Sequence, residues 1–157
     1  MQDKEDLAVS EGRIISPQEA VIRKKIGLVV LGVTLFTLLA YKPSREAYGP
    51  VSFAMMAGFG LYQTGVRSLW GCVLNLKTNF DGKGFKEPSE KNLDFIKSKR
   101  NEFIGLFVGG HLLGIVIALA AAAYMGHSSK KVTMSVLKWQ LGGLLVSLGL
   151  SLNAKWF

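Results

Sequence analysis

The chain has 157 residues, a formal net charge of +8 and one cysteine, and 49% of its residues are apolar. Charged residues make up 19%, below the roughly 25% that is typical of soluble domains, which disfavours an ordinary soluble domain. Because Cys72 is alone, an intrachain disulfide, a CxxC redox motif and a cysteine-rich metal site are excluded.

Four runs of the sequence are apolar, and only the last contains a formal charge, Lys138; the runs are 26–41, 47–66, 103–129 and 132–154. A run of about 18 or more apolar residues predicts a transmembrane helix, because about 20 residues cross the hydrocarbon core. A surface helix of a soluble protein would show a polar face, and these runs show none. We therefore expect an all-α integral membrane bundle of four transmembrane helices. It would form a single membrane domain, 1–157, with spans at about 21–41, 50–76, 102–126 and 132–154.

Local signals predict where these helices begin. Ser16-Pro17-Gln18-Glu19 is a capping box with proline at the first helical position, so the first helix should begin near Pro17. Gly49-Pro50 should open the second helix. In the central loop, 77–101, apolar residues return at helical spacing from Leu93. This pattern predicts a short basic interfacial helix that leads into the third span.

The segments that connect the predicted spans are alternately rich and poor in Lys and Arg. The N-terminal segment, the central loop and the C-terminal tail together carry 13 of them, and the other two links carry 4. The positive-inside rule then places both termini and the loop on the cytoplasmic side, or its matrix or stromal equivalent, of a multi-pass protein.

Small residues recur every four positions on the third and fourth spans, in GxxxG-like patterns. Residues four apart share a helix face, and small side chains there let helices approach closely in lipid. We expect a helix-packing or subunit interface, either within the chain or with a partner, at Gly105, Gly109, Gly110, Gly114, Ala118, Ala122, Gly143 and Ser147.

Basic residues at the ends of the spans are candidates for contact with lipid headgroups or another anion: Arg23, Lys24, Lys25, Arg67 and Lys138. Long cationic side chains can extend from a helix to the headgroup level. For Arg67 and Lys138 the alternative is coordination of a substrate or ion, because charges within spans are often functional.

No metal site and no cofactor is expected. Haem ligation through His111 or His127 is the alternative, but the two are sixteen residues apart on one helix. That spacing corresponds to about 24 Å, so they could not share one haem within a chain.

The absence of Asp and Glu from all four apolar runs disfavours a proton-coupled or cation-coupled transporter. The leading hypothesis is a small non-catalytic membrane protein, a structural, accessory or assembly subunit of a larger complex or a homo-oligomer. Its partners would be membrane lipids and other membrane subunits or itself. Nucleic acid is not expected, because the basic residues flank the spans, where anionic lipid explains them. A small channel or anion or metabolite transporter is the alternative, and a lipid-modifying membrane enzyme is the third.

Overall fold

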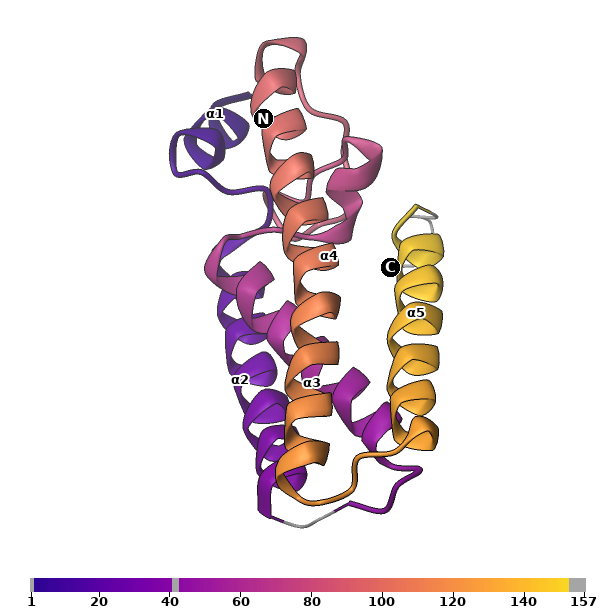
Figure 1. Ribbon diagram of the computed structural model, residues 1–157. Helices are drawn as coiled ribbons and strands as arrows, with labels where there is room; N and C mark the ends of the chain where they lie inside the picture. The colour runs from indigo at the N-terminus through magenta and orange to yellow at the C-terminus, as the bar shows by residue number, and fades with distance from the viewer. Residues whose placement is uncertain (1, 41–42, 153–157) are drawn as a thin grey trace.

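The computed structural model describes residues 2–40 and 43–152, and that part of the chain is all-helical (Figure 1). Its α-helices are α1 (Gln2–Ser10), α2 (Pro17–Ala40), α3 (Tyr48–Val66), α4 (Leu93–Tyr124) and α5 (Lys130–Leu152). Two short 3₁₀ helices are η1 (Gly71–Asn75) and η2 (Glu90–Asn92). The all-α prediction is therefore confirmed for the described residues.

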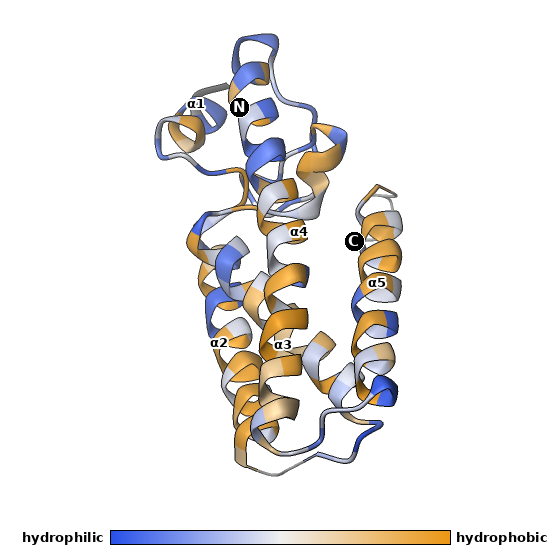
Figure 2. Cartoon of the chain, in the orientation of Figure 1, coloured by the Kyte–Doolittle hydropathy of each residue, from blue (hydrophilic) through white to orange (hydrophobic). Residues whose placement is uncertain are grey.

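The helices α2, α4 and α5 run roughly along the bundle, and α3 crosses diagonally between α2 and α5 (Figure 1). The helix α1 lies at one end together with η1 and the central loop. Hydrophobic colour dominates the bundle, and hydrophilic colour gathers in α1, in the loop and at the helix ends (Figure 2). Within the described residues, the segments Glu90–Tyr124 and Lys130–Leu152 are long and apolar enough to cross a membrane. The helix α2 carries three cations in its first turns, and α3 is interspersed with glycines and polar residues. The four-span arrangement thus stays a prediction.

Helix starts follow the local signals closely. The helix α2 begins at Pro17, and the backbone N–H of Glu19 donates to Oγ of Ser16 at 3.3 Å, as a capping box requires. The helix α4 begins at Leu93 and continues without interruption to Tyr124. No glycine or proline stands between 93 and 103, so the basic segment expected as an interfacial helix forms the first turns of α4.

The second long helix is shorter than the expected span of 50–76. The helix α3 begins at Tyr48 and ends at Val66, and the chain then turns through Ser68, whose φ is +52°. Leu69 is fully buried after this turn, and η1 follows. Ending α3 at Val66 gives up the hydrogen bonds of further helical turns, and the burial of Leu69 and of η1 residues such as Val73 offsets that loss.

We call the assembly of α1, residues 11–16, η1 and residues 77–92 the cap. The cap has a hydrophobic core of its own, formed with the start of α2 and the first part of α4: Ile14, Ile15, Ala20, Leu69, Val73, Ile96 and Phe103. A single bridge pairs Ile15 with Asn79, which ties the N-terminal segment to the central loop. The central loop is thus part of a packed unit, not an extended solvated link.

Two acidic residues dock α1 onto this unit. Oε1 of Glu5 accepts hydrogen bonds from the backbone N–H and the hydroxyl of Ser89, at 2.8 and 2.7 Å, and from Nδ2 of Asn92 at 2.7 Å. Asp6 pairs with Lys91 at 2.6 Å. Partial burial raises the pKa of the Glu5 carboxyl, but the hydrogen bonds from Asn92 and Ser89 outweigh it, so the pKa lies below its ordinary value.

The closest helix contact joins α2 and α3 through glycines. A Cβ added at Gly27 would lie 2.3 Å from the backbone nitrogen of Tyr62, and one at Gly58 would lie 2.6 Å from the backbone nitrogen of Leu31. At Gly65 it would lie 2.6 Å from the carbonyl oxygen of Ala20. Only glycine permits backbones to approach this closely, so these three positions fix the pairing of α2 with α3.

Candidate functional site

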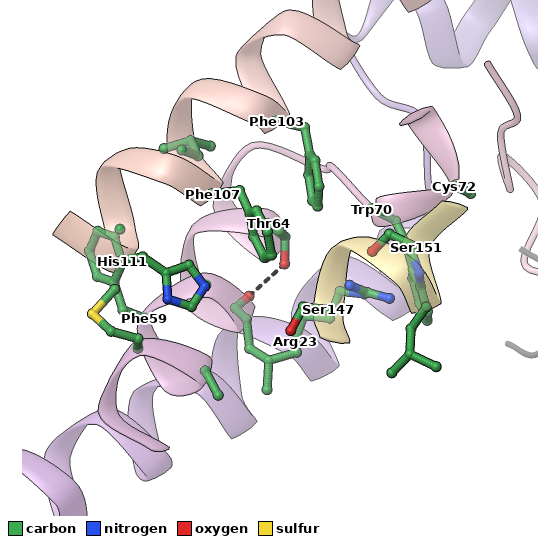
Figure 3. A pocket seen from close by; sticks show the side chains of 18 of the residues that line it. Arg23, Phe59, Thr64, Trp70, Cys72, Phe103, Phe107, His111, Ser147 and Ser151 are labelled. Atoms are coloured by element: carbon green, nitrogen blue, oxygen red, sulfur yellow. Dashed lines mark hydrogen bonds between the residues drawn. The ribbon is translucent and has the colours of Figure 1, made fainter. Parts of the chain in front are cut away.

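A cavity of about 490 Å³ lies between α3, α4, α5 and η1, on the cap side of the bundle (Figure 3). Its walls are largely aromatic, with the rings of Phe53, Phe59, Phe103 and Phe107 among the lining side chains. The volume falls within the range of about 300–1,000 Å³ that is typical of small-molecule sites, and such sites are mostly apolar with a few placed polar groups. The polar groups of this cavity come from α2, α3, α4 and α5.

His111 on α4 supplies one of these polar groups, and a buried hydrogen-bond chain holds its ring. Nδ1 of His111 lies 2.7 Å from Oε1 of Gln140 on α5. Nε2 of Gln140 donates to Oγ of Ser52 on α3 at 3.2 Å, and that hydroxyl donates to the carbonyl of Gly49 at 2.7 Å. His111 exposes 9% of its surface, and Gln140 and Ser52 expose none. The chain therefore links three helices inside the bundle.

The direction of this chain fixes the tautomer of the histidine. The Ser52 hydroxyl gives its proton to a backbone carbonyl, so it can only accept from the Gln140 amide. That places the amide oxygen toward His111, so Nδ1 must carry the proton. In the neutral ring, Nε2 then has a lone pair and acts only as an acceptor.

Arg23 on α2 lies at another part of the cavity lining, beside η1. Its guanidinium lies over the ring of Trp70, 3.1 Å from the ring centroid, and Nη2 pairs with Oε1 of Glu19 at 2.9 Å. Oε2 of Glu19 in turn accepts from Nδ2 of Asn79 at 3.3 Å. The Arg23 side chain is 11% exposed. Its charge is therefore balanced inside the protein, whereas the sequence suggested a contact with headgroups.

The other basic candidates lie at the surface or at its edge. Nη1 of Arg67 pairs with Oε1 of Glu102 at 2.7 Å, which ties the end of α3 to α4. Lys25 and Lys138 are exposed, and Lys24 is half-buried against Gly65. The structure does not bring these cations together with Arg23 into one cluster.

The small residues of α4 divide between two faces. Gly110, Gly114, Ala118 and Ala122 are buried and face the bundle. A Cβ at Gly114 would lie 2.2 Å from a side-chain carbon of Met56, so this face packs within the chain. On α5, a Cβ at Gly143 would meet the ring of Phe53, and Ser147 lines the cavity.

Gly105 and Gly109 lie on the outer face of α4. Both are exposed, and a Cβ added at either would meet nothing within 4 Å. Their i, i+4 spacing places them together on that face.

The two histidines occupy different surroundings. The Nδ1 atom of His127 lies 3.2 Å from the hydroxyl of Tyr48, on the connection between α4 and α5, away from the cavity. Within residues 2–40 and 43–152, no group of three or more His, Cys, Asp or Glu side chains is placed to hold a metal ion.

Sequence reasoning did not single out Gln140, Ser52, Trp70 or Glu19 as site residues. Gln140 could have been found, because it is a long polar side chain within the apolar run 132–154 and needs a partner there. The pairing of Trp70 with Arg23 had no such signal, because the two are far apart in the sequence.

No protein-family model matches the chain, and no curated protein or solved structure matches it.

Proposed function

We propose that the chain is a small, non-catalytic, four-span integral membrane protein that serves as an accessory or structural subunit of a membrane complex or of a homo-oligomer. The observation that carries this proposal is the exposed pair Gly105 and Gly109 on the outer face of α4. Bare glycines offer little surface to lipid tails, but they let the backbone of another helix approach closely. The expected occupant is a transmembrane helix of a partner or of a second copy.

Membrane insertion of α2 is supported by its exposed side chains. Ile26, Val29 and Val33 expose 50%, 65% and 61% of their surface and lie on one flank of the helix. An apolar flank of this kind is unfavourable in water and favourable in hydrocarbon. Together with α4 and α5, which have the length and composition of spans, this supports three crossings, and the fourth, by α3, is supported by the uncharged run 47–66.

The distribution of charge supports one orientation. The cap, which contains most of the Lys and Arg residues outside the helices, lies at one end of the bundle, and the α2–α3 and α4–α5 connections lie at the other (Figure 1). The cap end would face the cytoplasm, the matrix or the stroma.

Single cysteines introduced at exposed positions test this orientation in sealed vesicles. Lys4→Cys and Lys83→Cys on the cap should react with an impermeant maleimide from the same side, and Arg45→Cys only from the opposite side. The native thiol of Cys72 is 2% exposed and should contribute little background. If position 45 reacts from the same side as position 83, the four-span proposal is wrong.

The subunit role is tested by purification in mild detergent and measurement of native mass. We expect the protein to elute with a stoichiometric partner or as an oligomer, and Gly109→Leu to release the folded monomer. Gly32→Leu on α2 is the matched control, since a Cβ there also meets nothing within 4 Å. An assembly that Gly109→Leu leaves intact would show that this glycine pair faces lipid.

The arrangement of cations favours this proposal over an anion pathway. Such a pathway needs a cation that faces a path through the bundle, but Arg67 pairs with Glu102, Arg23 pairs with Glu19, and Lys138 is exposed on α5. Ion flux through liposomes that contain the purified protein alone would support the channel or transporter instead.

A further inference from the structure

The cavity contains a hydrogen-bond acceptor that nothing in the described chain satisfies. Nδ1 of His111 is bonded to Gln140, but Nε2 has no hydrogen-bond partner among residues 2–40 and 43–152. The residue is nine-tenths buried and lines the cavity, where Figure 3 shows its ring beside Phe59 and Phe107. Within the described residues no fully buried side-chain nitrogen or oxygen lacks a partner, so Nε2 is open to the space of the cavity, where the donor group of a bound molecule can reach it.

Two hydroxyls on the α5 wall are also without partners. Ser147 and Ser151 line the cavity one turn apart, and neither forms a hydrogen bond with any residue that the structure describes. Serines in apolar helices commonly donate to the carbonyl one turn earlier, and these two do not. They can therefore donate to or accept from a bound molecule.

The charge lining the cavity is balanced. Among the described residues that line the cavity, Arg23 alone is formally charged, and Glu19 neutralises it at 2.9 Å while Trp70 covers it. An anionic ligand would have to displace Glu19, and a cationic one would meet Arg23. A neutral molecule neither displaces Glu19 nor brings a second positive charge close to Arg23.

We propose that this cavity binds a neutral, lipid-soluble molecule with a hydroxyl group, and that this hydroxyl donates a hydrogen bond to Nε2 of His111. The aromatic walls contact the apolar body of the ligand, and Ser147 and Ser151 contact a second polar group where the molecule has one. The site goes beyond the proposed subunit role, and it holds whether or not the chain assembles with a partner.

The test uses photoactivatable long-chain probes that differ only in their head group. The purified full-length protein in lipid nanodiscs is labelled with a diazirine-bearing hexadecanol, its methyl ether and the corresponding hexadecanoate, and the labelled peptides are identified by mass spectrometry. We expect the alcohol to label the cavity about fivefold more than the ether, the ratio that one hydrogen bond supports. It should also exceed the carboxylate, and unlabelled hexadecanol should compete with it. Equal labelling by alcohol and ether would indicate only a lipid tail or water in the cavity and would overturn the proposal, as would preference for the carboxylate.

Two variants assign the preference to His111 and to the cavity. The double variant His111→Phe/Gln140→Leu removes the acceptor at Nε2 together with the amide that would otherwise lose its partner, so the alcohol and ether should label equally. Gly60→Leu should block all three probes, because Gly60 lines the cavity and a Cβ there meets nothing within 4 Å. Gly32→Leu, with the same open space but away from the cavity, should label as the native protein does. An alcohol preference that persists in His111→Phe/Gln140→Leu, or labelling that survives Gly60→Leu, would refute the assignment.

Discussion

The contact between α2 and α3 predicts that Gly27→Ala destabilises the protein although it adds a single methyl group. The new Cβ would lie 2.3 Å from the backbone nitrogen of Tyr62 and 2.6 Å from the carbonyl oxygen of Gly58. Both neighbours are backbone atoms, so no rotamer change relieves the clash. The two helices must separate by roughly an ångström to restore ordinary contact.

The expected cost follows from this separation. Overpacking of a close contact typically costs about 1–3 kcal/mol, and a rigid backbone neighbour favours the upper part of that range. Alanine also has a higher helix propensity than glycine, which would stabilise either helix. Gly32→Ala on the same helix has that gain without a clash, because its Cβ meets nothing within 4 Å. Gly27→Ala should therefore be less stable than Gly32→Ala by about 1–3 kcal/mol.

Reversible unfolding by sodium dodecyl sulfate in mixed micelles, followed by tryptophan fluorescence, measures this difference. The midpoint should fall for Gly27→Ala and stay level or rise for Gly32→Ala. Gly58→Ala should behave like Gly27→Ala, because its Cβ would lie 2.6 Å from the backbone nitrogen of Leu31. Equal midpoints for Gly27→Ala and Gly32→Ala would show that α2 and α3 are not packed in this register.

Three further outcomes follow from the structure. Gly114→Leu should lower the unfolding midpoint more than Leu113→Ala, since a Cβ added at Gly114 would lie 2.2 Å from the Met56 side chain and Leu113 is 43% exposed. Arg67→Glu should weaken insertion at equal expression, and adding Glu102→Arg should restore part of it. A double-mutant cycle of this half-exposed pair should give a coupling of no more than about 1 kcal/mol, and a larger value would contradict the assignment. Because the folded-state pKa of Glu5 lies below its ordinary 4.5, docking of α1 should be complete above that pH and lost as the pH falls through the lowered pKa. Protection factors of the α1 amides at pH 7 and below the lowered pKa measure this; Glu5→Gln should reduce the difference, and the pair of Asp6 with Lys91 should account for the rest.

The sequence by itself determined the helical class and most helix boundaries, because these depend on neighbours along the chain. Long apolar runs predict helices whose side chains avoid water. The Ser16-Pro17 pair specifies the start of α2 through a local cap, independently of the rest of the fold. Spacing alone places Gly110, Gly114 and Ala118 on one helix face, but it does not decide whether that face is buried, because Gly105 and Gly109 have the same spacing and are exposed.

Tertiary structure decided what the spacing could not. The end of α3 at Val66 depends on a core for Leu69 that residues from α2, η1 and α4 create together. The close contacts at Gly27 and Gly65 also needed the tertiary structure, because the sequence pattern of α2 or of α3 does not show which face of one helix packs against the other.

The cavity depends most on the three-dimensional fold. From the sequence, Arg23 is only a candidate for headgroup contact, whereas in the structure Trp70 and Glu19 enclose it. The nitrogen of His111 that carries the proton is set by Gln140 on another helix. These properties depend on pairs of side chains. In the pairs Arg23–Trp70 and His111–Gln140, the two residues lie far apart in the sequence. Local sequence determines the helices, but only the packing of the helices determines which side-chain polar groups form hydrogen bonds within the protein and which do not.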